Sequence, residues 1–164
     1  MSRPVPVIKL VWLSGRHASE LALLAADDWD VEGFVARAQR LRARGERDTF
    51  AVFVDDKRLV GLAMLGRDAT TPAHAEVGYW IGPRERGLGY ATSAVKQLLV
   101  RAFDRMHVTL VFAHCGKANH ASARVLTKIG FRRAEATRES PTADETIDRY
   151  ELTRDQWRST AHLT

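Results

Sequence analysis

The chain has 164 residues, of which 45% are hydrophobic and 27% are charged, so we expect one globular domain over residues 1–164 with a buried core. No apolar run approaches the roughly 18 residues that a membrane helix needs, and the first residues lack the basic-then-apolar order of a signal peptide. We therefore expect a cytoplasmic protein without a membrane partner, and the single cysteine, Cys115, fits a reducing compartment.

The formal net charge of +5 and the pI near 9.8 favour an anionic partner. A basic surface attracts nucleic acid as readily as it attracts a polyphosphate ligand. The basic residues are dispersed, however, without zinc-finger spacing or an aromatic-flanked basic platform, which argues against nucleic acid. The densest basic stretch lies opposite the apolar positions of a predicted helix and is typical of a solvated face. It consists of Arg37, Arg40, Arg42, Arg44 and Arg47.

The N-terminal half alternates between strand and helix patterns. A second helix begins after Asp30, whose side chain is a preferred N-cap, and stops at Gly45. A tight turn over residues 55–58 joins two strands, and a polar loop over residues 66–74 leads to a third, so the three strands form an antiparallel meander. In chain order the expected elements are strand 7–13, helix 19–26, helix 30–44 and strands 49–54, 59–65 and 76–81.

A glycine-bearing basic turn follows the third strand of the meander and opens directly into a helix. Gly87 and Gly89 carry no Cβ, so they can adopt positive φ and let backbone N–H groups converge on a ligand. The first turn of the helix adds N–H groups without helical partners and the positive end of the helix dipole. Phosphate oxygens suit such a site.

Two common phosphate-binding motifs do not fit this turn. A P-loop would place Lys and Ser or Thr after the second glycine, where the chain has Tyr90 and Ala91. The third glycine of a dinucleotide fingerprint would fall on Thr92, and no acidic residue ends a strand about twenty residues later. The pattern that remains is Arg-x-x-Gly-x-Gly, from Arg84 to Gly89.

The C-terminal half continues with a helix, a strand, a second helix and a strand pair. A helix over residues 88–106 crosses over the sheet, which places strand 108–114 parallel to strand 76–81. A helix over residues 121–129 ends at Gly130, and residues 131–136 pair with residues 148–152 across a polar loop. The broad apolar face of the first helix consists of Ala94, Val95, Leu98, Leu99, Ala102, Phe103 and Met106.

Two segments together resemble the GNAT superfamily of acetyl-CoA-dependent N-acetyltransferases. The Arg-x-x-Gly-x-Gly turn is similar to the pyrophosphate-binding signature of that superfamily. The segment from Asn119 to Phe131, which reads Asn-x-x-Ser-x-x-Val-Leu-x-Lys-x-Gly-Phe, is similar to its other signature in the RimJ/RimL-like form. The resemblance covers roughly residues 49–157. It implies an α/β fold in which helices flank a mixed central sheet, built from an antiparallel meander and a splayed parallel pair.

The resemblance implies acetyl-CoA as cosubstrate and no metal. The pantetheine arm would lie in the cleft where the two parallel strands splay apart, with the pyrophosphate on the basic turn. Asn119 would hydrogen-bond the pantetheine amides, with a turn-forming role as its alternative. The aromatic pair Tyr79 and Trp80 would line the site or pack in the core. The residues expected at the cosubstrate are Tyr79, Trp80, Ile81, Arg84, Arg86, Gly87, Leu88, Gly89, Tyr90, Ala91, Thr92, Asn119 and Ser122.

Acyl transfer to an amine needs a base for the amine, donors for the developing oxyanion and a proton for the departing thiolate. Glu76 enters the predicted cleft and is the leading candidate for the base, with a surface ion pair as its alternative and Asp148 as a second candidate. Backbone N–H groups of residues 79–81 would serve the oxyanion. The resemblance implies Ser122 as the acid, since Leu126 occupies the position of the Tyr that many members use. A helix N-cap is the alternative role of Ser122.

One other candidate site carries less weight. His114 stands next to Cys115 at a predicted strand end, which suggests a nucleophilic pair, but neighbours on a strand point to opposite faces. The remaining histidines show no metal-ligand spacing, so the sequence supports no metal site.

These observations predict an N-acetyltransferase that transfers the acetyl group directly to a primary amine in a ternary complex. An α-amine with a pKa near 8 is roughly 10% neutral at pH 7 and a lysine about 0.04% neutral, so the α-amine needs less help from a base. The RimJ/RimL-like resemblance implies a protein N-terminal α-amine, while the same branch includes enzymes of small-molecule amines and many homodimers. A non-catalytic CoA-binding GNAT-like module and a basic nucleic-acid-binding domain are the alternatives.

Overall fold

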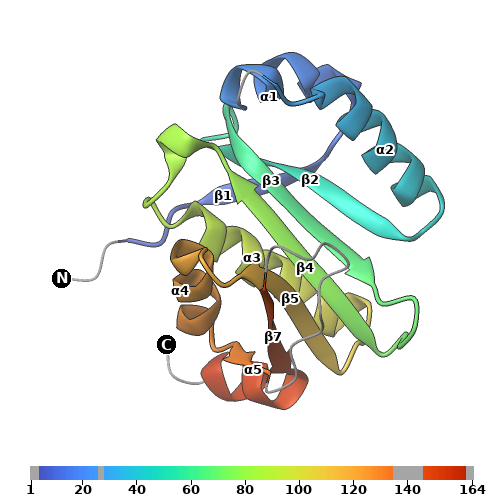
Figure 1. The fold of residues 1–164 in the computed structure, drawn as a ribbon, viewed down its shortest axis with the longest axis vertical. Helices are drawn as coiled ribbons and strands as arrows, with labels where there is room; N and C mark the ends of the chain where they lie inside the picture. The colour runs from blue at the N-terminus through green and yellow to red at the C-terminus, as the bar shows by residue number, and fades with distance from the viewer. Residues whose placement is uncertain (1–3, 26–27, 135–145, 162–164) are drawn as a thin grey trace. The chain divides into compact units, whose positions relative to one another are not determined.

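The computed structural model describes residues 4–25, 28–134 and 146–161 (Figure 1). The chain forms two compact units, one of Met1–Gly66 with Gly78–Leu98 and one of Arg67–Val77 with Leu99–Thr164. The end of the expected strand 131–136 and most of the polar loop that follows lie outside the described residues.

Three antiparallel strands form the sheet of the first unit, as the alternating sequence predicts. They are β1 (Ile8–Trp12), β2 (Arg47–Val54) and β3 (Arg58–Arg67), whose last residue belongs to the second unit. Asp55 and Asp56 have φ values of 57° and 55°, and the Lys57 N–H donates to the Val54 carbonyl at 3.2 Å. Two left-handed residues at the centre make this a type I′ hairpin turn, which confirms the predicted tight turn.

Two helices bury their apolar faces against these strands. The first is α1 (Ala18–Leu24), which follows a 3₁₀ turn at Gly15–His17. The second is α2 (Val31–Ala43), where the Asp30 carboxylate accepts the Gly33 N–H at 2.9 Å and Gly45 has a φ of 69° beyond the helix end. Both predicted ends of α2 are therefore confirmed. The buried cluster of this unit consists of Leu13, Leu21, Val31, Val35, Ala38, Ala51, Leu59 and Leu62.

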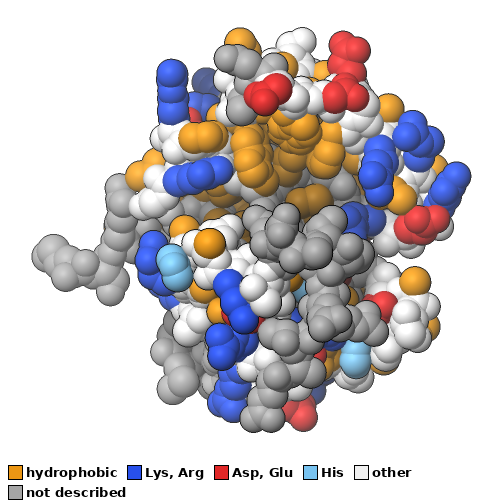
Figure 2. All heavy atoms as spheres, in the orientation of Figure 1, with side chains coloured by type: hydrophobic (Ala, Val, Ile, Leu, Met, Phe, Trp, Pro, Cys, Tyr) orange, Lys and Arg blue, Asp and Glu red, His pale blue; other side chains and the backbone are white. Residues whose placement is uncertain are grey.

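The basic residues of α2 lie on its outer face. They are exposed, whereas Val35 and Ala38 between them are buried. Figure 2 shows Lys and Arg side chains gathered over this helix. Arg42 also covers the ring of Trp12, with its guanidinium carbon 3.7 Å from the ring centroid. The interpretation as a solvated helix face is confirmed for Arg37, Arg40 and Arg42, whereas Arg44 follows the helix and Arg47 begins β2, both of them exposed.

The strand β4 (His74–Ile81) and the helix α3 (Tyr90–Val100) each extend through both units. The Gly82 N–H donates to the Val60 carbonyl at 2.9 Å, and the Asp68 N–H donates to the His74 carbonyl at 3.0 Å. Residue numbers fall on one strand as they rise on the other, so β4 runs antiparallel to β3 and completes the predicted meander.

The single helix expected over residues 88–106 is two elements. It is α-helical to Val100, and Arg101–Arg105 then form a π-helix in which the Met106 N–H reaches the Arg101 carbonyl at 3.1 Å. The Val108 N–H bonds the Ala102 carbonyl at 3.3 Å and so closes the helix end. Because the backbone of Val108 is used in this way, the next strand, β5 (Leu110–Gly116), starts two residues later than predicted. The predicted apolar face is buried from Ala94 to Phe103, and Met106 is half-buried.

The second unit holds the parallel strand pair. Residues 74–76 of β4 pair with residues 110–112 of β5 in parallel, as the crossover predicts. On its other side β5 pairs antiparallel with β7 (Ile147–Thr153), and β7 pairs antiparallel with β6 (Arg132–Arg133). Within the described residues the strand order is β1-β2-β3-β4-β5-β7-β6, which gives the mixed sheet of the predicted α/β fold.

Two helices flank the strands of the second unit. The predicted helix is α4 (His120–Ile129), which ends at Gly130 with a φ of 117°. The helix α5 (Arg154–Ala161) was not predicted, although the sequence carries a signal for it. The Thr153 hydroxyl accepts the Gln156 N–H at 3.2 Å and the Gln156 side chain accepts the Thr153 N–H at 2.9 Å, so Thr-x-x-Gln forms a capping box.

Candidate active site

The predicted phosphate turn of the first unit has the backbone geometry that its sequence indicates. Gly87 and Gly89 have φ values of 77° and 86°, in the left-handed region that favours glycine. The Gly89 carbonyl accepts the Ser93 N–H at 3.1 Å, so α3 starts directly after the turn. The first N–H groups of α3 have no acceptor within the helix and are available to an anion at its N-terminus. Around the turn Arg84, Arg86, Gly87 and Gly89 are exposed, Leu88, Ala91 and Thr92 are half-buried, and Tyr90 is buried.

Two arginines hold this turn in place. Arg86 donates its Nε–H to the Ile81 carbonyl at 2.9 Å, which ties the turn to the end of β4. Arg58, at the start of β3, forms an ion pair with Glu85 and donates to the Tyr90 hydroxyl at 3.3 Å. These hydrogen bonds, with Glu85 first, raise the pKa of Arg58 and keep it charged. Sequence reasoning missed Arg58 because its partners lie 27 and 32 residues away along the chain.

The residues at the end of β4 take part in packing. Trp80 packs against the buried cluster of the first unit, and its ring centroid lies 5.4 Å from that of Trp29. A Cβ placed on Gly61 would come within 2.2 Å of the Trp80 carbonyl oxygen, so the two backbones are in close contact. Ile81 is buried and Tyr79 is half-buried. The side chain of Trp80 therefore has a core role, and its place at the cosubstrate stays a prediction.

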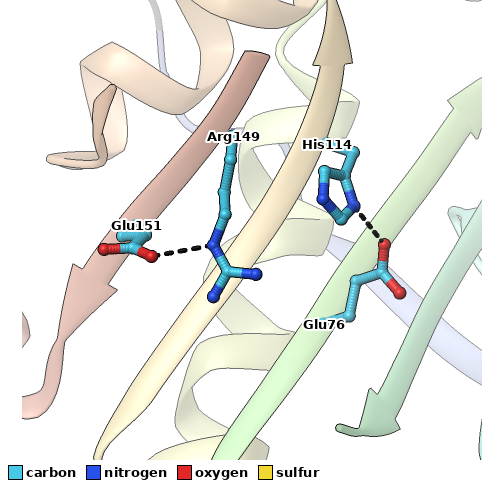
Figure 3. A network of polar contacts seen from close by, with 4 residues as sticks. All are labelled: Glu76, His114, Arg149 and Glu151. Carbon is cyan, nitrogen blue, oxygen red and sulfur yellow. Dashed lines mark hydrogen bonds and ion pairs between the residues drawn. The ribbon is translucent and has the colours of Figure 1, made fainter. Parts of the chain in front are cut away.

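In the second unit Glu76 points at a histidine. Glu76 Oε1 lies 2.9 Å from His114 Nδ1 (Figure 3). Glu76 and Phe112 form the last pair of the parallel ladder, and His114 follows two residues later on β5. The side chains of Glu76 and His114 are 32% and 39% exposed, so a ligand can reach both. Sequence reasoning considered His114 only with Cys115, because the register of β4 against β5 was not known from the sequence.

The strand β7 adds a basic and an acidic side chain to the same face (Figure 3). Arg149 is the cross-strand partner of His114, and its guanidinium lies over the ring of Phe112 at 3.8 Å from the centroid. It also donates its Nε–H to Glu151 Oε1 at 2.7 Å. The ring of Phe112 meets that of His114 edge-on at 5.5 Å. His114 therefore lies between a carboxylate on β4 and a guanidinium on β7.

The cap of α4 is Asn119 and not Ser122. Asn119 Oδ1 accepts the Ser122 N–H at 3.1 Å, so the N-cap alternative for Ser122 is wrong. Ser122 is the third residue of the helix and is half-buried. Leu126, one turn further on, is fully buried and offers no proton donor.

The opposite face of β5 and β7 is buried. Asp148, the second candidate for the base, is 6% exposed and is the cross-strand partner of Cys115. Its Oδ2 lies 3.5 Å from Arg133 Nη1, and its Oδ1 has no hydrogen-bond partner among the described residues. Since successive side chains alternate, Asp148 faces away from Glu76, and exposed His114 and buried Cys115 point to opposite faces as expected.

Within the described ranges no three His, Cys, Asp or Glu side chains gather in a way that could hold a metal ion. In the same part of the chain no helix is long and apolar enough to cross a membrane. The groups that the described units offer for chemistry include a glycine turn at the N-terminus of α3, a carboxylate–imidazole pair and a capped helix N-terminus.

Residues 10–132 match the family of the acetyltransferase (GNAT) domain. The chain belongs to this family. The Bacillus subtilis protein named "Probable N-acetyltransferase YjcK" is 30% identical over 129 residues, which cover 74% of this chain and 70% of that protein. The GNAT fold and the class of N-acetyltransferase, both predicted from the two motifs, are confirmed.

Solved structures of acetyltransferases share the fold of this GNAT chain. A Vibrio cholerae protein provisionally named a ribosomal-protein-serine acetyltransferase has a TM-score of 0.77 and 23% identity, over 89% of this chain and 93% of that one. The spermidine N-acetyltransferase of Vibrio cholerae, solved with CoA and spermine, has a TM-score of 0.77 and 14% identity, over 92% and 98%. At these identities the likeness concerns the fold alone.

Proposed function

We propose that this GNAT chain transfers the acetyl group of acetyl-CoA to a primary amine by direct attack in a ternary complex. The acceptor is a protein N-terminal α-amine or the amine of a small molecule. The signature from Asn119 to Phe131 supports a place in the RimJ/RimL-like branch.

The backbone of the basic turn is the observation that carries the proposal. A pyrophosphate needs several donors that converge from one side, and two left-handed glycines in the turn that leads into α3 favour that arrangement. Arg84 and Arg86 add positive charge at the exposed side of the turn. Acetyl-CoA carries a pyrophosphate that fits this turn, and it brings an activated thioester carbonyl to the amine.

The other predicted residues have roles that agree with their local geometry. Asn119 uses Oδ1 for the cap of α4, so its amide Nδ2 is the group that would donate to pantetheine. Ser122 would give a proton to the thiolate, and backbone N–H groups of residues 79–81 would face the oxyanion. Glu76 supplies the negative charge that proton removal from the amine requires.

The charges around Glu76 favour an acceptor with one amine. Glu76 and Glu151 are two carboxylates on this face, and Arg149 offsets one of them through its 2.7 Å contact with Glu151. A polyamine carries several positive charges and would need more carboxylates than the described residues of this face provide. An N-terminal α-amine carries one positive charge, which matches the charges on this face, and it loses a proton more easily than a lysine amine.

Binding and turnover test the proposal separately. We expect acetyl-CoA and desulfo-CoA to raise the melting temperature and ATP to leave it unchanged, since a ligand at 100 times its Kd adds about 2.7 kcal/mol. CoA release is then measured with peptides bearing N-terminal Ser or Ala and with spermidine. Acceptor-dependent release supports the proposal. Stabilisation without release from any acceptor would point to a non-catalytic CoA-binding module, and no stabilisation at millimolar acetyl-CoA would contradict the proposal altogether.

A further inference from the structure

We propose that His114 accepts the proton of the acceptor amine, and that Glu76 is a positioning residue that holds His114 in the required tautomer. The inference rests on the proposed function, because it assigns roles within that reaction. It moves the base from Glu76, the leading candidate from the sequence, to a histidine that sequence patterns offered little reason to select.

The position of the pair suits this role. Glu76 belongs to the last pair of the parallel β4–β5 ladder, and His114 lies one side-chain step beyond it on the same face of β5. We expect the pantetheine arm, and with it the thioester, at the point where these two strands part, as predicted from the sequence. The His114 side chain is 39% exposed, so it is accessible, while its ring contacts both Glu76 and the ring of Phe112.

The contact between Glu76 and His114 determines which ring nitrogen carries the proton. A carboxylate can only accept, so the 2.9 Å contact places the proton on Nδ1 of the imidazole. The lone pair then lies on Nε2, which points away from Glu76 and is able to take a proton. A carboxylate in this place also stabilises the imidazolium that forms.

Imidazole is the better base of the two. Glutamate titrates near 4.3 and histidine near 6.5 in model peptides, and general base catalysis is most effective when the pKa lies near the working pH. Glu76 Oε1 also contacts His114 Nδ1, so the carboxylate lies on the Nδ1 side of the imidazole ring, away from Nε2. Both observations assign Glu76 to orientation and His114 to proton transfer.

Charged groups face His114 from both neighbouring strands. Glu76 approaches from β4, and Arg149 and Glu151 lie on β7. Arg149 is only 16% exposed, because it stacks on Phe112 and donates to Glu151. The His114 imidazole therefore has a carboxylate on the β4 side and a guanidinium on the β7 side.

In the proposed step the lone pair of the neutral amine forms the C–N bond to the thioester carbon, and the carbonyl π electrons move to oxygen. The nitrogen, now positively charged, gives one proton to His114 Nε2. The electrons on oxygen return, and the C–S bond breaks with its electron pair on sulfur. The thiolate takes one proton from the Ser122 hydroxyl, which regains a proton from solvent, and the imidazolium returns one proton to solvent. The products are an amide and the CoA thiol.

The first test compares His114→Gln, Glu76→Gln and the control His74→Gln, a histidine on the same face of β4 as Glu76. The probes are acetyl-CoA with an N-terminal Ser peptide, or with spermidine if only spermidine is acetylated. We expect kcat/KM to fall at least about 100-fold in His114→Gln, about 10-fold or more in Glu76→Gln and little in His74→Gln. The double variant should be no slower than His114→Gln alone.

Two kinetic results would overturn the inference. One is a loss in Glu76→Gln that exceeds the loss in His114→Gln. The other is His114→Gln activity within about threefold of wild type, which is too small for a lost general base. In either case wild-type turnover would still support the proposed function, so the two failures are distinguishable.

A spectroscopic test needs no acceptor. Long-range ¹H–¹⁵N spectra distinguish a protonated Nδ1 from a protonated Nε2 in neutral histidine. We expect the proton of His114 on Nδ1 in wild type at about pH 8 and a loss of that preference in Glu76→Gln. A proton found on Nε2 in wild type would overturn the inference whether or not any acceptor is acetylated.

Discussion

At the scale of single residues, Gly87 is required for its backbone conformation and not for its packing. A Cβ at Gly87 would meet no atom within 4 Å, yet its φ of 77° is a conformation that other residues rarely adopt. Alanine at this position therefore acts on the backbone and not through a clash. The same residue lies in the turn that we propose to bind the pyrophosphate, so its conformation bears on both stability and acetyl-CoA affinity.

We expect Gly87→Ala to lower the free energy of unfolding by about 1–2 kcal/mol, because an L-residue is strained in the left-handed region. The KM for acetyl-CoA should rise more than kcat falls, since the turn holds a part of the ligand that does not react. Urea unfolding and steady-state kinetics measure both. Gly15→Ala is the control, since Gly15 also has open space but no positive φ. An unchanged KM in a destabilised Gly87→Ala would argue against the proposed site.

The two kinds of site residue differ in how far the sequence reveals them. The glycines of the turn are recognisable because their conformation is a local property of a few neighbouring residues. The contact of Glu76 with His114 joins residues 38 apart, and Arg58 meets the turn from another strand. Such contacts depend on the register between strands, and hydrophobic patterns do not specify which residue of one parallel strand faces which residue of the next.

At the scale of elements, the start of α4 assigns different roles to two neighbouring polar residues. Asn119 caps the helix through its side chain, whereas Ser122 contributes its backbone N–H to that cap. We expect Asn119→Ala to lower the unfolding free energy by about 1 kcal/mol and Asn119→Asp to keep the cap. Ser122→Ala should preserve the cap and its stability.

Stability and rate must be measured on the same variants. If Ser122 protonates the thiolate, Ser122→Ala loses kcat while its urea midpoint stays near that of wild type. If kcat instead falls only in proportion to stability across Asn119→Ala, Asn119→Asp and Ser122→Ala, Ser122 has a structural role.

Local signals predicted most elements, and tertiary contacts changed the rest. The cap at Asp30, the glycine stops and the hairpin turn are properties of short segments, and all agree with the structure. The π-helix at Arg101–Arg105 was not predictable from an apolar face with helical spacing, since the same face serves both helix types. The place of β7 between β5 and β6 depends on long-range pairing. The expectation of one domain over residues 1–164 stays a prediction.

At the scale of the whole molecule, a buried histidine links stability to pH. His17 is 5% exposed, its Nδ1 accepts the Ser14 N–H at 3.1 Å, and Arg16 lies 3.1 Å from its Nε2. Burial and then the charge of Arg16 lower the pKa of His17 from its ordinary value of 6.5. In the folded chain His17 therefore stays neutral at a pH where His17 of the unfolded chain is already protonated.

This linkage has a definite sign. Below pH 6.5 the unfolded state binds more protons than the folded state, so the unfolding free energy falls as pH drops toward the lowered pKa. The slope from one proton is at most about 1.4 kcal/mol per pH unit, and the contribution of His17 is constant above that window. We expect His17→Gln to be less stable at neutral pH but to show a shallower decline in acid.

Urea unfolding across the acid range measures this slope. His120→Gln is the matched control because His120 is exposed on α4, and its slope should equal that of wild type. An unchanged slope in His17→Gln would show that another group causes the acid sensitivity.

The burial of Cys115 has a practical consequence for measuring this enzyme. Its thiol is the only one in the chain, is 4% exposed and lies 3.4 Å from the Asn119 carbonyl oxygen. A colorimetric thiol reagent added to the folded protein should therefore react slowly with the protein and rapidly with each CoA that turnover releases. The same reagent, used without substrate, reports how often the segment around Cys115 opens to solvent. One chromophore can thus record catalysis in seconds and local opening over much longer times.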